Sequence, residues 1–541
     1  MKRARSSGLA AGPSGALTHS ATIQYPLARC PGCSKPVYPY SQVAVTAAVL
    51  DTGGWKQMLH IPVRCRDTGA CPWGGKRIWH NFISESKTEH FWTWPTEQEL
   101  GVFFLWSDWG VTTAWLRQMA RRVVHHFASF AGEAAVHRAE AAFTGSAGMV
   151  PAKAGAKLFR AWIVWRAIIR MEEHGLALES VYPGPRGANL LEDLEVLLDG
   201  IWEWYPEHML AKRVACCRAA GADLSKLVVD GNQKLCRRVC GRPVAEISES
   251  KALGMCTVTP CSCKPAFKQR RCRQHAASAP PSDRGPEQSE VITGHRRLRA
   301  VHGAAIEGEP YQVQLKSKDS LDDSRVSGRW VGAECATAGQ LYDYWSSWER
   351  RRYLPKASSP ADLGSTQCKT HKEGMKGFRK LVKQGRMCGW LFTVTSTGLI
   401  VHAKEFIGVE SISQRYFHIA ELLPHIPELA VIVHDDACHL RKFAEKHSGH
   451  SALAARLAYP SIKYIIDKMH AKGHTDPWCL AHCHPDVPEN ALAVFGVRTP
   501  ACETANSVLG RHKFAYRHMR KRVSSFFMHE MIGARNAAAI S

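Results

Sequence analysis

The segment "VIVHDDACHL", residues 431–440, constrains the fold most, because a strongly apolar run ends there at two adjacent aspartates, Asp435 and Asp436. A buried strand does not normally end in two charges that nothing neutralises. Successive side chains of a strand point to opposite faces, so only one of the two carboxylates can face a given site. The segment therefore predicts a buried strand whose end carries an acid at a site that needs a charge.

The order of the predicted elements around this strand indicates the fold class. A short strand ending at Asp230, a hairpin with "STG" at its turn and an amphipathic helix come first, and two strands and a closing helix follow. These elements are predicted over 226–232, 389–406, 411–426, 429–436, 462–470 and from about 501. Strand, hairpin, helix, strand, strand, helix is the order of an RNase H-like domain. The prediction is an α/β fold with an RNase H-like mixed sheet core and a large insertion after the first strand.

Three acids of this predicted domain lie where they can meet. In such a fold the first and fourth strands are neighbours, so Asp230 and Asp435 would end on adjacent strands, and Glu503 on the closing helix can face them. Converging carboxylates repel one another unless cations lie between them. Two Mg²⁺ ions about 3.5–4 Å apart would neutralise them and hold the attacking and leaving oxygens of a phosphodiester. We predict Asp230, Asp435 and Glu503 as catalytic residues; the alternative for a lone aspartate at a strand end is a solvated turn.

The length of the chain, 541 residues, exceeds what a single hydrophobic core usually holds. Leu158, Trp162, Trp165 and Ile169 recur at helical spacing and predict a helical module before the α/β domain. The predicted organisation is a disordered segment over 1–25, a zinc-ribbon-like β unit over 26–105, the helical module over 106–222, and the RNase H-like core over 223–541, with 240–385 as a cysteine-containing insertion and linker.

The charge balance favours a polyanionic partner. Lys and Arg number 71 against 48 Asp and Glu, a net charge of +23, and nucleic acid is the usual partner of so basic a protein. The alternative is a soluble protein that is merely basic. The segment 511–522, with Phe514 and Tyr516 among basic residues, predicts either a DNA-backbone surface or a solvated helix face. The apolar runs are too short to cross a bilayer, so no membrane partner is expected.

Cysteine usage indicates metal binding. In an intracellular chain, 19 cysteines suggest metal ligands before disulfides. "CPGC" supplies Cys30 and Cys33, and "CRDTGAC" supplies Cys65 and Cys71, which together make four thiolates in two pairs. A zinc-ribbon-like site is predicted at these four residues. The alternative is four unrelated buried cysteines.

Two further constellations follow. The insertion carries Cys240, Cys256, Cys261, Cys263, Cys272 and His275, in which "RCRQH" forms a close Cys-x-x-His pair typical of a zinc knuckle. The segment "HAKGHTDPWCLAHC" carries His470, His474, Cys479, His482 and Cys483. This second set could bind zinc, contact the phosphate backbone or hydrogen-bond the sheet edge.

Five segments, in order, resemble a known family. The chain is similar to the Kyakuja–Dileera–Zisupton (KDZ) transposases and their relatives with an N-terminal CxC-type cysteine cluster. The segments are "VDGNQKLCRRVC", "ESISQRYFHIAELL", "VHDDACHLRKF", "DKMHAKGHTDPWC" and "CETANSVLGR".

The resemblance implies the same three catalytic acids, Asp230, Asp435 and Glu503. His434 stands where an aromatic residue is usual, and Asp436 is the additional acid. Near Glu503 the chain departs from the family, because Thr504 and Asn506 replace the usual Arg and Trp.

The resemblance also implies zinc ligands. In the insertion it selects Cys240, Cys256, Cys272 and His275, with Cys261 and Cys263 as possible substitutes. After the second acid, a family His-x3-His pair followed by a cysteine falls on His470, His474 and Cys479, which we therefore name as candidate metal ligands.

Two functions are expected from these observations. The first is a KDZ-like DDE transposase in the nucleus that binds DNA and cuts and joins phosphodiesters with two catalytic Mg²⁺ ions and about two structural Zn²⁺ ions. Homo-oligomerisation is compatible with it. The second is a domesticated, catalytically inactive zinc-cluster protein that binds DNA or chromatin, an alternative favoured by the altered residues around Glu503.

Overall fold

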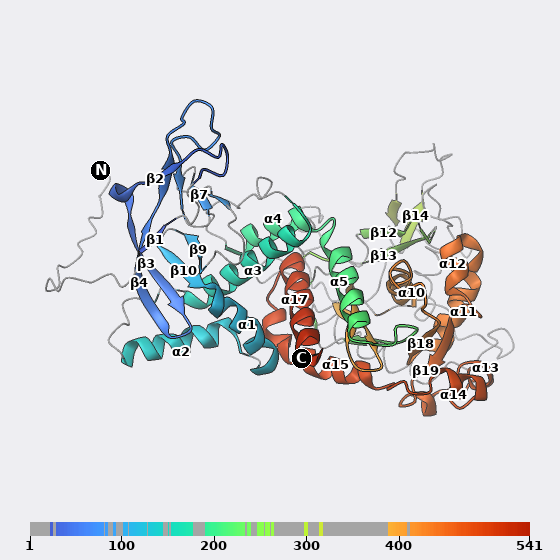
Figure 1. Ribbon diagram of the computed structural model, residues 1–541. Coiled ribbons are helices and arrows are strands. Elements are labelled where there is room, and N and C mark those ends of the chain that lie inside the picture. The colour runs from blue at the N-terminus through green and yellow to red at the C-terminus, as the bar shows by residue number, and fades with distance from the viewer. Residues whose placement is uncertain are drawn as a thin grey trace. The chain divides into compact units, whose positions relative to one another are not determined.

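The computed structural model divides the chain into two compact units, Met1–Gly200 and Ile201–Ser541 (Figure 1). The structure describes residues 22–24, 29–79, 82–84, 90–92, 101–106, 108–126, 128–143, 150, 153–176, 190–232, 235–237, 239, 246–250, 252–253, 255–259, 261–263, 297–300, 313–316, 388–407, 410 and 412–540.

The first unit contains two five-stranded sheets. One has the strand order β1-β4-β3-β10-β9 and the other β2-β5-β6-β7-β8. Their bounds are β1 Thr22–Gln24, β2 Val37–Pro39, β3 Val45–Asp51, β4 Gly54–Ile61, β5 Val63–Cys65, β6 Arg77–Ile78, β7 Phe82–Ser84, β8 His90–Trp92, β9 Val102–Trp106 and β10 Trp109–Thr112. The predicted N-terminal β unit is therefore present. Strand β1 falls within the segment predicted as disordered, and it pairs with β4.

The helices of the first unit follow its sheets, as the change in hydrophobic period predicts. They are α1 Thr113–His126, α2 Phe130–Phe143, α3 Ala154–Glu173 and α4 Leu190–Ile201. Leu158, Trp162, Trp165 and Ile169 are all buried on α3. The ring of Phe130 on α2 packs against Trp162, which therefore lies at the contact between the two helices.

The second unit is built on a five-stranded mixed sheet with the order β17-β16-β11-β18-β19. Strands β11, β16 and β17 pair antiparallel, whereas β11, β18 and β19 run parallel. The bounds are β11 Lys226–Asn232, β16 Cys388–Thr395, β17 Ile400–Ile407, β18 Val431–His434 and β19 Lys463–Ile466. The predicted strands and hairpin are present, and β11 lies beside β18.

Helices cover both faces of this sheet (Figure 1). Leu227 and Val229 of β11 pack with residues of α5, α10, α11 and α12 on one face, and Val228 packs with residues of α15 and α17 on the other. The helices are α5 Tyr205–Ala219, α10 Ile412–Ala420, α11 Ala437–His447, α12 Ala452–Leu457, α13 Pro477–His482, α14 Pro488–Ala493, α15 Ala501–Leu509, α16 Lys513–Tyr516 and α17 Lys521–Ile540. Helix α5, which the sequence places in the helical module, belongs to the core of the second unit.

Two hairpins are described within the insertion. Strand β12 (Glu246–Ser250) pairs with β13 (Met255–Thr259), and β14 (Arg297–Ala300) pairs with β15 (Val313–Lys316). The second hairpin lies in a span predicted as a loop or linker. No helix in the described part of the chain combines the length and apolar character that crossing a bilayer requires.

Candidate functional site

Asp230 and Asp435 meet because of the register between two parallel strands. Strand β11 pairs with β18 up to Val228 and Val433, so each aspartate lies two residues beyond the last pair. Since side chains alternate along a strand, both carboxylates project to the side of the sheet that Val228 and Val433 face. Their oxygens and a ring nitrogen of His434 lie within 4.8 Å of one another. We call Asp230, His434 and Asp435 the acid cluster.

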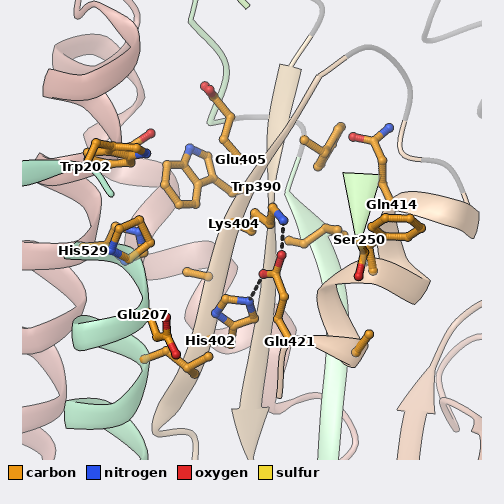
Figure 2. Close-up of a pocket in the computed structure, with 18 of the residues that line it drawn as sticks. Trp202, Glu207, Ser250, Trp390, His402, Lys404, Glu405, Gln414, Glu421 and His529 are labelled. Carbon is orange, nitrogen blue, oxygen red and sulfur yellow. Dashed lines mark hydrogen bonds and ion pairs between the residues drawn. The ribbon is translucent and has the colours of Figure 1, made fainter. Parts of the chain in front are cut away.

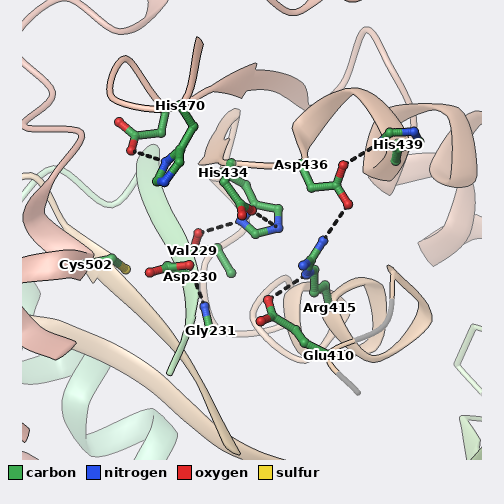
Figure 3. A network of polar contacts seen from close by, with 12 residues as sticks. Val229, Asp230, Gly231, Glu410, Arg415, His434, Asp436, His439, His470 and Cys502 are labelled. Carbon is green, nitrogen blue, oxygen red and sulfur yellow. Dashed lines mark hydrogen bonds and ion pairs between the residues drawn. The ribbon is translucent and has the colours of Figure 1, made fainter. Parts of the chain in front are cut away.

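His434 fixes one side of the acid cluster. Its Nδ1 donates a hydrogen bond to the carbonyl oxygen of Val229 at 2.8 Å (Figure 3), so in a neutral ring Nε2 carries a lone pair. That Nε2 lies 2.9 Å from Oδ1 of Asp435. Neither atom has a hydrogen-bond partner among the described residues, although both are buried. Two lone pairs that face each other at this distance fit a cation, either a proton or a metal ion.

The two carboxylates titrate in opposite directions. Burial raises the pKa of Asp230 well above its usual value, and the charges of Asp435, Glu410 and Glu503 raise it further. Burial also opposes ionisation of Asp435, but the charge of His434 holds the pKa of Asp435 below its usual value, with Arg415 contributing. Without a cation the pair thus favours one proton, held by Asp230. A divalent cation bound between the two carboxylates would offset their repulsion, so that Asp230 would lose this proton.

Glu503 occupies the first turn of α15 and is exposed. Its charge acts on Asp230, but among the described ligand atoms its carboxylate stands outside the acid cluster. Residues on either side of it attach α15 to β11. The thiol of Cys502 donates to the carbonyl of Val228 at 3.2 Å, and Nδ2 of Asn506 donates to Oδ2 of Asp230 at 2.8 Å. The structure therefore brings two of the three predicted acids together and places the third on the adjoining helix.

Asp436 points away from the acid cluster. Nη1 of Arg415 donates to its Oδ2 at 3.0 Å, and Nε of Arg415 donates to Oε1 of Glu410 at 2.7 Å (Figure 3). Asp436 also contacts His439. The first of the two adjacent aspartates thus joins the cluster, while the second is neutralised by an arginine.

Glu410 and Arg415 were not identified from the sequence. A Cβ on Gly231 would lie 2.0 Å from Oε2 of Glu410, so the glycine leaves the space that this carboxylate fills beside Asp230. The available sequence signal was Gly231 itself, directly after the first acid.

Asp467 is a fourth strand-end acid that the sequence interpretation passed over. Strand β19 pairs with β18 up to Ile466 and His434, so Asp467 follows β19 at the level of Asp435. It is buried, and its Oδ2 lies 3.0 Å from Nδ1 of His470. The hydrogen bond to Asp467 raises the pKa of His470, and the charges of Asp435 and Glu503 add to that rise. The apolar run "KYIID" carried the same signal as "VIVHD".

The four N-terminal cysteines form a compact cluster that could hold zinc. The Sγ atoms of Cys30 and Cys71 are 3.4 Å apart, and those of Cys33 and Cys65 are 3.5 Å apart. A tetrahedral zinc with Zn–S bonds of about 2.3 Å holds its sulfurs roughly 3.8 Å apart, so the spacing fits. Lys35 and Asp67 join the two knuckles by an ion pair at 2.5 Å.

Cys438, His474 and Cys479 form a second group that could hold zinc, with ligand atoms within 4.8 Å of one another. This set differs from the predicted His470, His474 and Cys479. His470 is bonded to Asp467 instead, and Cys438 at the start of α11 is present in its place.

The predicted ligands of the insertion are not tested by the structure. Cys240, Cys272 and His275 lie outside the described residues, and the side chain of Cys256 is likewise not described. Of the possible substitutes, Cys261 is buried and Cys263 is exposed.

The basic segment 511–522 has two sides. Tyr516 is buried; its hydroxyl donates to Oε1 of Glu405 at 2.8 Å and accepts from Nε1 of Trp390. Tyr516 therefore belongs to the core and cannot stack on a nucleotide base. Arg511 and Lys513 are exposed.

A separate pocket of about 690 Å³ lies along the edge strand β17 (Figure 2). Within it, Nε2 of His402 lies 3.0 Å from Glu421, which also contacts Lys404. The lining includes Trp202, Trp390 and His529 and none of the residues of the acid cluster. The pocket is thus distinct from the place where the acids meet.

The comparisons with known proteins identify no family. No family model matches the chain, and neither a curated protein nor a solved structure matches it. The chemistry of the acid cluster is therefore argued from its own residues.

Proposed function

We propose that this chain is a KDZ-like DDE transposase, or a protein derived from one, which binds DNA and cuts and joins phosphodiesters with two metal ions. The observation that carries the proposal is the acid cluster, in which Asp230 on β11 and Asp435 just after the parallel neighbour β18 lie at the same level. Carboxylates at that position, with an unpartnered oxygen on Asp435, match the ligands that Mg²⁺ prefers.

The sheet supports an RNase H-like core as the finer fold assignment. The first of its strands, β11, lies between the hairpin β16–β17 and the parallel strands β18 and β19, and the insertion follows β11. This is the arrangement that the order of elements in the sequence predicts, with β11 beside β18.

Each residue of the site has a defined task in this proposal. Asp230 and Asp435 would hold the metal ions. Asn506 orients the carboxylate of Asp230 through its hydrogen bond, and Nε2 of His434 lies beside Asp435 at 2.9 Å. Arg415 keeps Asp436 and Glu410 neutralised, so their charges do not compete for the same cation. Glu503, exposed on α15, is free to turn toward the acid cluster. When bound, two Mg²⁺ ions would activate a water or a DNA 3′-OH and offset the charge that develops on the phosphate.

The test is nicking of supercoiled plasmid DNA by the full chain. We expect nicking that requires Mg²⁺ or Mn²⁺ and that Asp435→Asn abolishes while DNA binding persists, because the substitution removes one ligand charge and little of the basic surface. Asp436→Asn is the matched control; it should weaken the fold by leaving Arg415 without one partner, yet the folded fraction should still cut. Cleavage by Asp435→Asn with none by folded Asp436→Asn would overturn the assignment.

A second candidate function is a domesticated protein that binds DNA or chromatin without cutting it. The observation that favours it is Glu503, which stands outside the acid cluster next to the exposed Thr504. Gel-shift binding of DNA by a folded chain that never nicks plasmid with either metal would select this function.

The proposed partners and location follow from charge. A net charge of +23 supports binding to DNA, either transposon ends or genomic DNA, and hence a nuclear location. A homo-oligomer is also proposed, because joining two DNA ends requires two active sites held together.

A further inference from the structure

Three metal-ligating side chains gather beside the start of α11, on the side of Cys438. The Sγ of Cys438, a ring nitrogen of His474 and the Sγ of Cys479 lie within 4.8 Å of one another. The three residues are 0%, 2% and 1% exposed. They come from three segments of the chain, namely the first turn of α11, the end of the turn after β19, and α13.

The distances are those of a coordination shell. Sγ of Cys438 lies 3.6 Å from Nδ1 of His474, whereas Nδ1 of the neighbouring His439 contacts Asp436. A tetrahedral zinc with Zn–S of about 2.3 Å and Zn–N of about 2.0 Å holds sulfur and nitrogen roughly 3.5 Å apart. The N-terminal cysteine cluster shows the same close spacing, with sulfurs 3.4 and 3.5 Å apart.

Existing hydrogen bonds show which of the nearby histidines are not part of the group. His470 is bonded to Asp467, and Nδ1 of His482 donates to the carbonyl of Trp478 at 2.9 Å. Nε2 of His474 is buried and has no hydrogen-bond partner among the described residues. Nδ1 is therefore the ring nitrogen of His474 that faces Cys438 and would bind the zinc, which leaves Nε2–H to donate to a water molecule.

We propose that Cys438, His474 and Cys479 form a structural zinc site with a Cys₂His ligand set. The site would join the start of α11, directly after Asp435, to the segment that follows β19 and carries His470. A zinc there would hold together the two connections that leave the sheet beside the acid cluster. The inference does not depend on the proposed function, because structural zinc is needed whether or not the protein cuts DNA.

The test is the zinc content per chain of the full protein, purified without chelator and measured by elemental analysis. His474→Ala and Cys479→Ser should each contain one zinc fewer than the wild type. Cys483→Ser is the matched control, since Cys483 is also buried and lies four residues beyond Cys479, and it should keep the wild-type content. Combining Cys33→Ser with His474→Ala should remove two zinc ions, because Cys33 belongs to the other cluster.

A ligand swap keeps the test decisive if His474→Ala does not fold. His474→Cys replaces an imidazole by a thiolate, so folded His474→Cys protein should retain the wild-type zinc content. Wild-type zinc content in Cys479→Ser, or folded His474→Cys with one zinc fewer, would overturn the proposal. If the wild type and the variants show the expected zinc contents but the wild type does not nick DNA, only the proposed function is contradicted.

Discussion

At the scale of single residues, the site depends on which carboxylate carries a proton. The partly buried Asp230 is forced toward its neutral form by burial and by Asp435, whereas Asp435 stays charged beside His434 and Arg415. Divalent cations and protons therefore compete for the same two carboxylates.

The first prediction concerns Asp230→Asn in magnesium-free buffer. A carboxyl group with a raised pKa in the folded state stabilises the fold fully only below its unfolded pKa of about 3.9, and this contribution is lost as the pH rises toward the folded value. At pH 8 we expect the variant to be more stable than the wild type by about 1 kcal/mol, a figure that allows for solvent screening. The amide oxygen of the new asparagine can still accept from Nδ2 of Asn506, which donates to this position in the wild type.

Thermal unfolding at pH 5 and pH 8 measures this difference. The advantage of Asp230→Asn should be smaller at pH 5, and added Mg²⁺ at pH 8 should raise the melting temperature of the wild type more than that of the variant. A wild type that is the more stable protein at pH 8 without magnesium would show that Asp230 is not under electrostatic strain.

The sequence identifies Asp230 and Asp435 from the ends of two apolar strands, but it does not identify their partners. Arg415 and Glu410 precede β18 in the chain and reach the site only because α10 packs beside α11. His470 was grouped with His474 from the His-x3-His pair that the resemblance implies and from its spacing. A spacing of four residues places two histidines on one face of a helix, yet this segment forms a 3₁₀ turn in which Asp467 holds His470.

At the scale of elements, the register between neighbouring strands determines which side chains meet at the acid cluster. The mixed sheet and its strand order follow from the order of hydrophobic segments, and the structure has strands where the sequence predicts them. Helices α11 and α12 between β18 and β19 were not predicted. They are nevertheless required, because β18 and β19 are parallel and parallel neighbours need a crossover connection.

The second prediction concerns the contact between β11 and the segment before α10. In Gly231→Ala the new Cβ would displace the carboxylate of Glu410 and break its ion pair with Arg415, which is buried. We expect a loss of about 2–4 kcal/mol in the free energy of unfolding. Gly533→Ala is the control, because a Cβ at Gly533 in α17 meets nothing within 4 Å and should stabilise the helix by about 0.5–1 kcal/mol. Urea unfolding of both variants and of the wild type measures these differences. A Gly231→Ala variant as stable as the wild type would contradict the close approach of Glu410 to Gly231.

At the scale of the whole molecule, the excess of positive charge is the property most open to direct measurement. The composition predicts a polyanionic partner, but it cannot tell which basic residues are exposed. Within 511–522 the aromatic residue Tyr516 is buried in the core, whereas Arg511 and Lys513 are exposed. A DNA surface here would consist of the charged residues without base stacking on Tyr516.

The third prediction separates these two roles. Arg511→Glu with Lys513→Glu should weaken DNA binding and reduce the slope of log K against log salt by about 2, because two phosphate contacts are lost. Tyr516→Phe should lower stability by about 1–3 kcal/mol through the lost hydrogen bond to Glu405, and leave the salt slope unchanged. Fluorescence anisotropy across a salt series tests both. A salt slope that the charge reversals leave unchanged would remove this segment from the DNA-binding surface.

The measurement that tests the central claim most directly is Mn²⁺ binding to the full chain at pH 8, detected by electron paramagnetic resonance. The acid cluster predicts that the wild type binds Mn²⁺, that Mg²⁺ displaces it, and that Asp230→Asn and Asp435→Asn each weaken binding at least 10-fold. Asp436→Asn, whose carboxylate faces Arg415, should bind Mn²⁺ as the wild type does. Equal Mn²⁺ affinity in the wild type and both cluster variants would contradict the account.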